Sequence, residues 1–199
     1  MDKEKKKYIF LISIVVIGIV MGIIFANILN TSDKILVKDK INGFFMNIKN
    51  NAKIDYFANF KNSLFSNALY VLVIWILGLS IIGLGLNIFI LFFKSFTVGF
   101  SIGSIINIYL YKGILGSILY VFPHIIINLM LLIILAYYAN NISIKIFKLL
   151  FLKQDIKFSE VIKKYNKVLL YSLIITLIST IIETFLHPLI IKIFTICLK

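Results

Sequence analysis

The sequence predicts an all-α, polytopic integral membrane protein with about five transmembrane helices and one amphipathic helix in the membrane interface. Of its 199 residues, 61% are hydrophobic and 15% are charged, whereas soluble domains contain about 25% charged residues. The mean hydropathy is +1.03, and uncharged stretches long enough to cross a bilayer, which takes about 20 helical residues, recur along the chain. Two prolines and one cysteine argue against a collagen-like chain or a disulfide scaffold. We expect a single membrane domain over residues 1–199.

The chain is also strongly basic, with 21 lysines, no arginine and a formal net charge of +13. The absence of arginine removes the forked side chain that most bidentate contacts with phosphate, carboxylate or guanine use. In a chain this apolar, anionic membrane lipid is the expected partner of the lysines, and we expect no nucleic acid. Coding bias in an AT-rich genome is the simplest explanation for the excess of lysine, isoleucine and asparagine.

The first predicted span covers about residues 8–29, because residues 8–32 carry no charge. Lysines precede it at positions 3, 5, 6 and 7, as in a signal peptide. Its apolar run is longer than the roughly 7–15 residues of a signal peptide, and no A-x-A cleavage sequence follows. We therefore expect an uncleaved anchor.

Two further spans are predicted on either side of Lys94. Residues 63–93 are uncharged and would form about 46 Å of helix, so we expect one span over about 64–93 that bends or extends beyond the hydrocarbon. Residues 95–111 are also uncharged and give a short third span. This interpretation places Lys94 in the loop between the two spans.

The last two spans are predicted from further uncharged stretches. The stretch after Lys112 contains Pro123, which interrupts a helix, so a short lead-in precedes a fourth span over about 120–144. A basic cytoplasmic loop over about 145–167 follows, and the fifth span covers about 168–191.

An outside segment over about residues 30–63 is predicted between the first two spans. From Ile41 to Leu64, apolar residues recur at intervals of mostly three and four, which is typical of an amphipathic helix. We expect this helix to lie in the membrane interface with four phenylalanines inserted, or to pack onto the rest of the bundle.

Lysine placement predicts the orientation in the cell membrane. With the N-terminus in the cytoplasm, 12 lysines fall in the inner segments and nine in the outer ones. The four lysines of the short N-terminal segment favour this orientation, and five spans then put the C-terminus outside.

Few side chains in the sequence are suited to chemistry. Cys197 has no partner cysteine, and His124 and His187 are too isolated in sequence to indicate a metal site, which needs several converging ligands. The nucleophile-elbow, zinc-protease, phosphate-loop and dinucleotide-binding motifs are missing from the sequence. We therefore expect no catalytic, cofactor-binding or metal-binding residues, and a protein that is not an enzyme.

Glycines on the predicted second and third spans indicate close helix packing, because small residues let helix backbones approach one another in lipid. They are Gly78, Gly83, Gly85, Gly99 and Gly103. Gly99 and Gly103 form a G-x-x-x-G pair, which predicts a tight contact between the second and third spans or between two copies in a homo-oligomer.

Polar residues at membrane depth are costly and often functional. They are Asn87, Asn107, His124, Asn128, Glu183 and His187. His124 with Asn128, and Glu183 with His187, are four residues apart and share a helix face. We expect the first pair to make interhelical hydrogen bonds and the second to pair near the outer end of its span. Proton or ion transport is the alternative for both pairs.

Three segments of the sequence resemble the stage II sporulation protein M family. Residues 75–84 (WILGLSIIGL) and 93–103 (FKSFTVGFSIG) are similar to its central signature, and residues 111–124 hold the next match, from Tyr-Lys-Gly to Phe-Pro-His. The layout of a basic N-terminus, one anchor, an outside loop and four further spans also fits. The wider family often has a glutamate shortly after the Pro-His pair, where this chain has Asn128, and this difference argues against a role for a carboxylate there.

The resemblance implies a protein of endospore formation, located in the mother-cell membrane at the septum and around the forespore. Family members act with two membrane-anchored, peptidoglycan-degrading partners, the stage II sporulation proteins D and P. The resemblance thus implies a non-enzymatic scaffold that recruits and positions these partners during engulfment. Candidate docking residues are the aromatic side chains of the outside segment: Phe44, Phe45, Tyr56, Phe57 and Phe60.

A permease or channel component is the alternative function. Pro123 and the intramembrane polar residues are compatible with it. It predicts a continuous polar path through Asn87, Asn107, His124 and Asn128.

Overall fold

The computed structural model describes residues 3–49, 55–121, 123–153 and 158–197, which form helices joined by short turns. No strand occurs among these described residues, and the predicted all-α fold class is confirmed. In chain order the elements are α1 (Lys3–Ile28), α2 (Thr31–Lys49), α3 (Tyr56–Gly78), α4 (Gly83–Val121), α5 (His124–Phe151), α6 (Phe158–Ile181), the π-helical turn η1 (Ile182–Leu186) and α7 (His187–Cys197).

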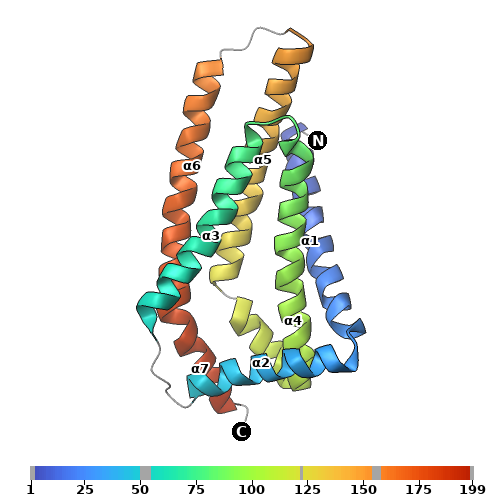
Figure 1. The fold of residues 1–199 in the computed structure, drawn as a ribbon, viewed down its shortest axis with the longest axis vertical. Helices are drawn as coiled ribbons and strands as arrows, with labels where there is room; N and C mark the ends of the chain where they lie inside the picture. The colour runs from blue at the N-terminus through green and yellow to red at the C-terminus, as the bar shows by residue number, and fades with distance from the viewer. Residues whose placement is uncertain (1–2, 50–54, 122, 154–157, 198–199) are drawn as a thin grey trace.

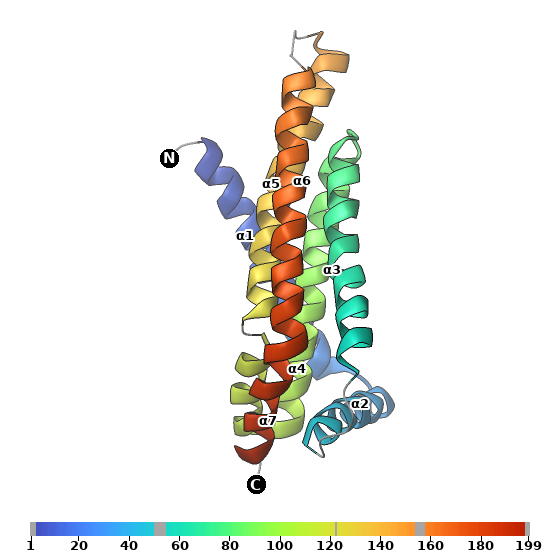
Figure 2. The same cartoon turned by 90° about the vertical axis from the view of Figure 1, so that its left-hand side faces the viewer.

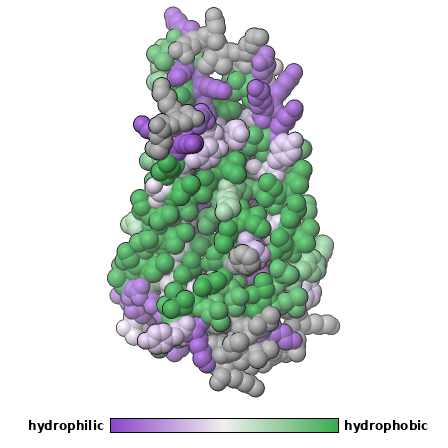
Figure 3. All heavy atoms as spheres, turned by 180° about the vertical axis from the view of Figure 1, so that it is seen from behind, coloured by the Kyte–Doolittle hydropathy of each residue, from purple (hydrophilic) through white to green (hydrophobic). Residues whose placement is uncertain are grey.

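The bundle is elongated, and α2 lies across one end of it (Figure 1). Figure 2 shows the same arrangement from the side, with the two termini at opposite ends of the bundle. Five helical stretches are long and apolar enough to cross a membrane. Apolar side chains form a band around the middle of the molecule, and polar side chains gather at its two ends (Figure 3). These features are those of a multi-pass membrane protein.

The helix α5 is the most enclosed of the five spans. Half of its most apolar window is buried, against 11% of the corresponding window in α3. Ile74 of α3, Leu91 of α4 and Leu135 of α5 are fully buried where these helices meet. The apolar core therefore forms around α5.

The second and third spans differ from the predicted ones. The chain turns at Leu79–Ile82 before α4 begins, and the Gly83 N–H donates to the carbonyl oxygen of Ser80 at 3.2 Å. Residues 64–93 therefore do not form one bent helix. Instead α4 continues through Lys94, which lies inside a span and not in a loop. Gly78 and Gly83 flank the turn that ends α3, whereas a single lysine is a good helix former and does not end a helix.

The helix α4 contains a sharp turn at Leu110, where φ is 51° and ψ is −125°. The chain then doubles back, because a Cβ atom added to Gly113 would lie 2.6 Å from the carbonyl oxygen of Ile105. The returning arm ends at Val121, and α5 follows. The predicted lead-in is thus the second arm of a helical hairpin, and the predicted fourth span, 120–144, begins later than expected.

The last span is a continuous helical path through α6, η1 and α7. The His187 N–H donates to the carbonyl of Ile182, five residues earlier, which makes this turn π-helical. Pro188 explains the wider turn, because proline has no N–H and its ring clashes with the carbonyl four residues back in a regular α-helix. The path begins at Phe158, ten residues before the predicted span 168–191.

The predicted basic loop over 145–167 is mostly helical. The helix α5 continues to Phe151 and α6 begins at Phe158, while residues 154–157 lie outside the described residues. Polar side chains gather beyond the apolar band at the two ends of the molecule (Figure 3). The lysines at 145, 148, 163, 164 and 167 lie on α5 and α6 and not in a loop.

The predicted single helix over 41–64 is wrong, because the structure divides this segment between α2 and α3. Asp55 caps α3, since its carboxylate accepts a hydrogen bond from the Ala58 N–H at 2.9 Å, and aspartate is a preferred N-cap residue. Residues 50–54 lie outside the described residues. The apolar period is similar on both sides of the break, so the pattern alone did not reveal it.

The helices α1 and α4 pack with their backbones in close contact. A Cβ atom added to Gly22 would lie 2.6 Å from the Phe100 nitrogen, and one added to Gly103 would lie 2.9 Å from the Ala26 Cβ. Gly99 likewise meets the backbone of α1. We predicted that this glycine pair contacts the second span or a second copy of the chain, but in the structure it contacts the first span.

The other predicted packing glycines behave differently from one another. A Cβ atom added to Gly78 would lie 2.8 Å from the Ala139 Cβ of α5, so this glycine also permits a close helix contact. Gly83 meets the backbone of Leu77 across the α3–α4 turn. Among the described residues, nothing lies within 4 Å of a Cβ added to Gly85, so this glycine takes no part in the helix packing that they form.

Candidate functional site

A polar cavity of about 230 Å³ lies inside the bundle at the level of Lys94. Side chains from α3, α4, α5 and η1 supply its polar lining: Asn67, Lys94, Thr97, Ser101, Tyr120, His124, Asn128 and Glu183. Lys94 comes eleven residues after the start of α4, which is about 16 Å along the helix and near the middle of a hydrocarbon layer about 30 Å thick. Charged groups at this depth usually mark functional sites.

Glu183 enters the cavity from η1 and is held by α3. The Ser63 hydroxyl donates to its Oε1 at 2.8 Å, and the Asn67 amide donates to its Oε2 at 3.1 Å. We predicted that Glu183 pairs with His187, but its two carboxylate oxygens bond to α3 instead. π-Helical turns are frequent at functional sites, and this one carries the acidic residue of the cavity.

Lys94 is the charged residue of this site that sequence reasoning missed. Its Nζ lies 4.4 Å from the ring centroid of Tyr70, within the range of a cation–π interaction, and Glu183 is the acidic residue that lines the same cavity. The sequence does contain an indication that Lys94 lies inside a helix and not in a loop. Lys94 has no glycine, proline or asparagine beside it, whereas three glycines lie between positions 78 and 85, where the chain actually turns.

His124 and His187 meet at the edge of the cavity, although they are 63 positions apart in the chain. Their ring centroids are 4.5 Å apart, and the two residues are only 5% and 7% exposed. No residue in the described part of the chain supplies a hydrogen-bond partner for His124 Nδ1 or His187 Nε2. The described residues include no group of three or more His, Cys, Asp or Glu that could hold a metal ion, and we assign no metal centre to the pair.

The remaining predicted polar residues are distributed over several places. Asn128 lines the cavity, but Asn87 and Asn107 are not among its lining residues. The Asn87 amide donates to Asn140 Oδ1 at 3.4 Å, and the Asn107 amide donates to the carbonyl oxygen of Ala26 at 3.2 Å. These two asparagines therefore tie α4 to α5 and to α1.

The predicted docking aromatics lie near the end of the bundle that carries α2, and one of them is buried. Phe45 is 3% exposed and packs against Ile191 of α7, so it belongs to the internal packing of the protein. Phe44 of α2 is 44% exposed.

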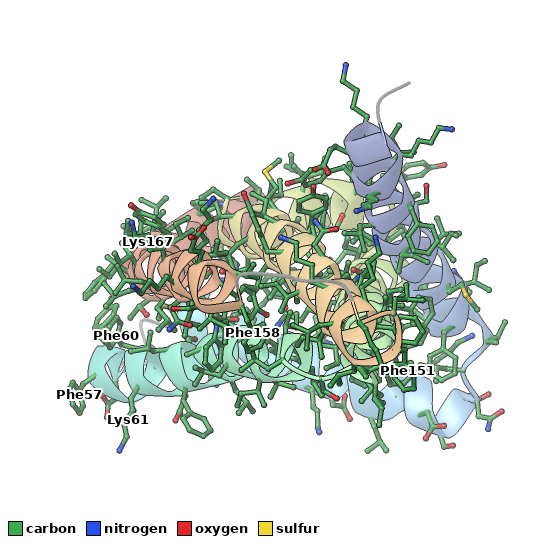
Figure 4. All side chains as sticks on the ribbon, turned by 90° about the horizontal axis from the view of Figure 1, so that it is seen from above. Phe57, Phe60, Lys61, Phe151, Phe158 and Lys167 are labelled. Atoms are coloured by element: carbon green, nitrogen blue, oxygen red, sulfur yellow. The ribbon has the colours of Figure 1, made fainter. Side chains whose placement is uncertain are left out.

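The other three docking aromatics lie on the first turns of α3. Phe57 is 78% exposed and points away from the bundle (Figure 4). The Tyr56 ring stacks on Phe185 of η1, with ring centroids 5.7 Å apart, and Phe60 is half-buried. The exposed aromatic surface is thus smaller than the sequence indicated, and Phe44 and Phe57 are its most open phenylalanines.

A comparison with models of protein families matches residues 10–188 to stage II sporulation protein M. A search of curated proteins and a search of solved structures each gave no match. The matched range includes the polar cavity, α2 and most of every predicted span. This family consists of sporulation-related membrane proteins and is not known as a family of enzymes. The chain therefore belongs to the stage II sporulation protein M family.

Proposed function

We propose that this protein is a non-enzymatic scaffold that recruits and positions the stage II sporulation proteins D and P during engulfment of the forespore. Membership of the family supports a role in sporulation. In this proposal the N-terminus lies in the cytoplasm of the mother cell, in agreement with the lysines of the N-terminal segment. α2 and the C-terminus then face the cell wall.

The placement of α2 is the observation that carries this proposal. One side of α2 is fixed to the bundle, because Phe45 packs against Ile191 and the Tyr109 hydroxyl donates to Asn42 Oδ1 at 2.8 Å. The rest of its surface is open and includes large apolar side chains: Ile35, Leu36, Phe44 and Met46. A helix that is held on one side, with exposed apolar side chains among charged ones on the other, offers a docking surface for the membrane anchors or stems of wall-degrading partners.

Copurification from sporulating cells tests the proposal. We expect the double variant Phe44→Ser with Phe57→Ser to reduce recovery of proteins D and P by roughly tenfold or more, as for exposed aromatic anchors of an interface. Phe57 is 78% exposed and Phe44 is 44% exposed, so neither substitution removes a buried core side chain, and we expect the protein still to insert.

The matched control is Phe65→Ser with Phe89→Ser, which removes two phenylalanines that are 70% and 61% exposed along the spans. We expect this control to retain both partners. Equal recovery from the two double variants at equal protein levels contradicts docking at α2.

A permease or channel component is the second candidate function, and the cavity around Lys94 favours it. Lys94, Glu183 and the two histidines are proton-binding groups inside the membrane. This function predicts proton flux into liposomes that contain the purified protein, and loss of the flux in Lys94→Met. Wild-type liposomes without flux above that of empty liposomes would contradict it.

A further inference from the structure

A second large cavity opens at the N-terminal end of the bundle. Its volume is about 600 Å³, and α1, α5 and α6 line it. The cavity is open because the N-terminal part of α1 leans away from α5 and α6 (Figure 2). The glycine contact with α4 holds α1 further along its length, so the gap opens only toward the N-terminus.

The lining of this cavity is positively charged. Four lysines line it, from three helices: Lys7, Lys145, Lys148 and Lys164. Two acidic residues, Glu4 and Glu160, also line it, which leaves an excess of two positive charges. All six side chains are exposed to the surroundings, so the excess is available to a negatively charged ligand.

The floor of the cavity is aromatic. The rings of Tyr8 and Tyr137 stack with centroids 4.1 Å apart, and Lys7 Nζ is held beside them by Asn141 Oδ1 at 2.6 Å. Tyr165 is buried, with its hydroxyl donating to the carbonyl oxygen of Trp75 at 3.0 Å. Tyrosines are enriched at the depth of lipid headgroups, and the apolar band of the molecule begins next to this end (Figure 3).

Apolar surface continues from the cavity along α5. Ile134 is 47% exposed and lies one helical turn before Tyr138, which lines the cavity. A ligand with its charged part among the lysines would therefore have apolar surface below it for acyl chains.

We propose that this cavity binds the headgroup of an anionic phospholipid with two phosphates, of the diphosphatidylglycerol type. The two excess charges match two phosphates, and Lys145, Lys148 and Lys164 supply ammonium donors for them. Basic pockets between transmembrane helices are a known form of site for such headgroups. The site lies at the end of the bundle opposite α2 (Figure 1), and its occupancy does not depend on the proposed scaffold function.

Lipid binding to the purified full-length protein tests this inference. Native mass spectrometry in a non-ionic detergent measures retention of diphosphatidylglycerol, of phosphatidylglycerol at twice the concentration, and of phosphatidylcholine. We expect one diphosphatidylglycerol per chain in the wild type. The triple variant Lys145→Gln, Lys148→Gln, Lys164→Gln should bind it on the order of a hundredfold more weakly, at about fivefold per lysine.

The matched control neutralises three lysines at the same end that do not line the cavity: Lys153, Lys163 and Lys167. Lys167 lies on the side of α6 away from α1 (Figure 4). We expect this triple variant to bind like the wild type. If both triple variants lose lipid equally, the attraction is general and the site is overturned.

Two further outcomes also overturn the proposal. Phosphatidylglycerol bound as tightly as diphosphatidylglycerol would show that a second phosphate is not recognised. Inorganic pyrophosphate that raises the melting temperature as much as the lipid would show an anion site without a lipid requirement. If the triple variant does not fold, Lys145→Gln and Lys148→Gln are measured singly, each with about fivefold weaker binding expected.

Discussion

The contact between α1 and α4 permits a quantitative prediction for the single substitution Gly99→Ala. A Cβ atom at position 99 would lie 2.7 Å from the Ile19 Cα, whereas carbon atoms normally approach to about 3.5–4.0 Å. The two helices must therefore separate by about 1 Å, which removes a quarter to a half of the attraction of each contact across the gap.

Two effects of opposite sign determine how much Gly99→Ala changes the free energy of unfolding. Overpacking costs about 1–3 kcal/mol, and alanine is favoured over glycine inside a helix by about 1 kcal/mol. Because the added atom at position 99 meets backbone that cannot rotate away, we expect the upper part of the overpacking range. The free energy of unfolding should fall by about 1–2 kcal/mol.

Gly85→Ala is the matched control, because nothing lies within 4 Å of its added Cβ. Only the helix propensity changes there, so the free energy of unfolding should stay constant or rise by up to about 1 kcal/mol. Reversible unfolding in mixed micelles with increasing sodium dodecyl sulfate measures both variants, with the fluorescence of the single tryptophan, Trp75, as the signal. The reasoning is refuted if Gly99→Ala is as stable as the wild type, or if both variants are destabilised equally.

Two further predictions use the same unfolding measurement. Leu110→Gly should raise the free energy of unfolding by about 1 kcal/mol, because a side chain at positive φ is strained. Leu110 is 69% exposed, so the substitution removes little packing. A lower free energy of unfolding in this variant would contradict the prediction. Lys94→Met should lower the free energy of unfolding by about 1 kcal/mol, because it removes the cation–π contact with Tyr70 and the positive charge that shares the cavity with Glu183. The double variant Lys94→Met with Glu183→Gln should lose less than the sum of the two single variants, and strict additivity would indicate that the two groups do not interact.

The expected number of spans rested on local properties and agrees with the five apolar helical stretches in the structure. A bilayer requires about 20 apolar residues per helix, so each span can be recognised from the hydropathy of its own segment of the sequence. The ends of the spans are less clear from hydropathy. The charge of Lys94 predicts a boundary, yet α4 continues through it, with the Lys94 Nζ near the Tyr70 ring and Glu183 in the same cavity.

The candidate site was predictable only in part. The depth of Glu183, His124 and Asn128 in their spans made them candidates from sequence. Their hydrogen-bond partners could not be predicted from the sequence. Ser63 and Asn67 are polar residues of α3 with no distinguishing pattern, and only the orientation of α3 in the bundle places them against Glu183.

By itself the sequence determined that this is a helical membrane protein of the stage II sporulation protein M family, because hydropathy and the family signature are read along one segment at a time. The tertiary structure alone decided which helices meet. It placed α1 against Gly99 and brought His187 to His124, and it put Lys94 and Glu183 into one cavity. These contacts join residues far apart in the chain, and they depend on the depth and rotation of each helix, which the packing of the whole bundle sets.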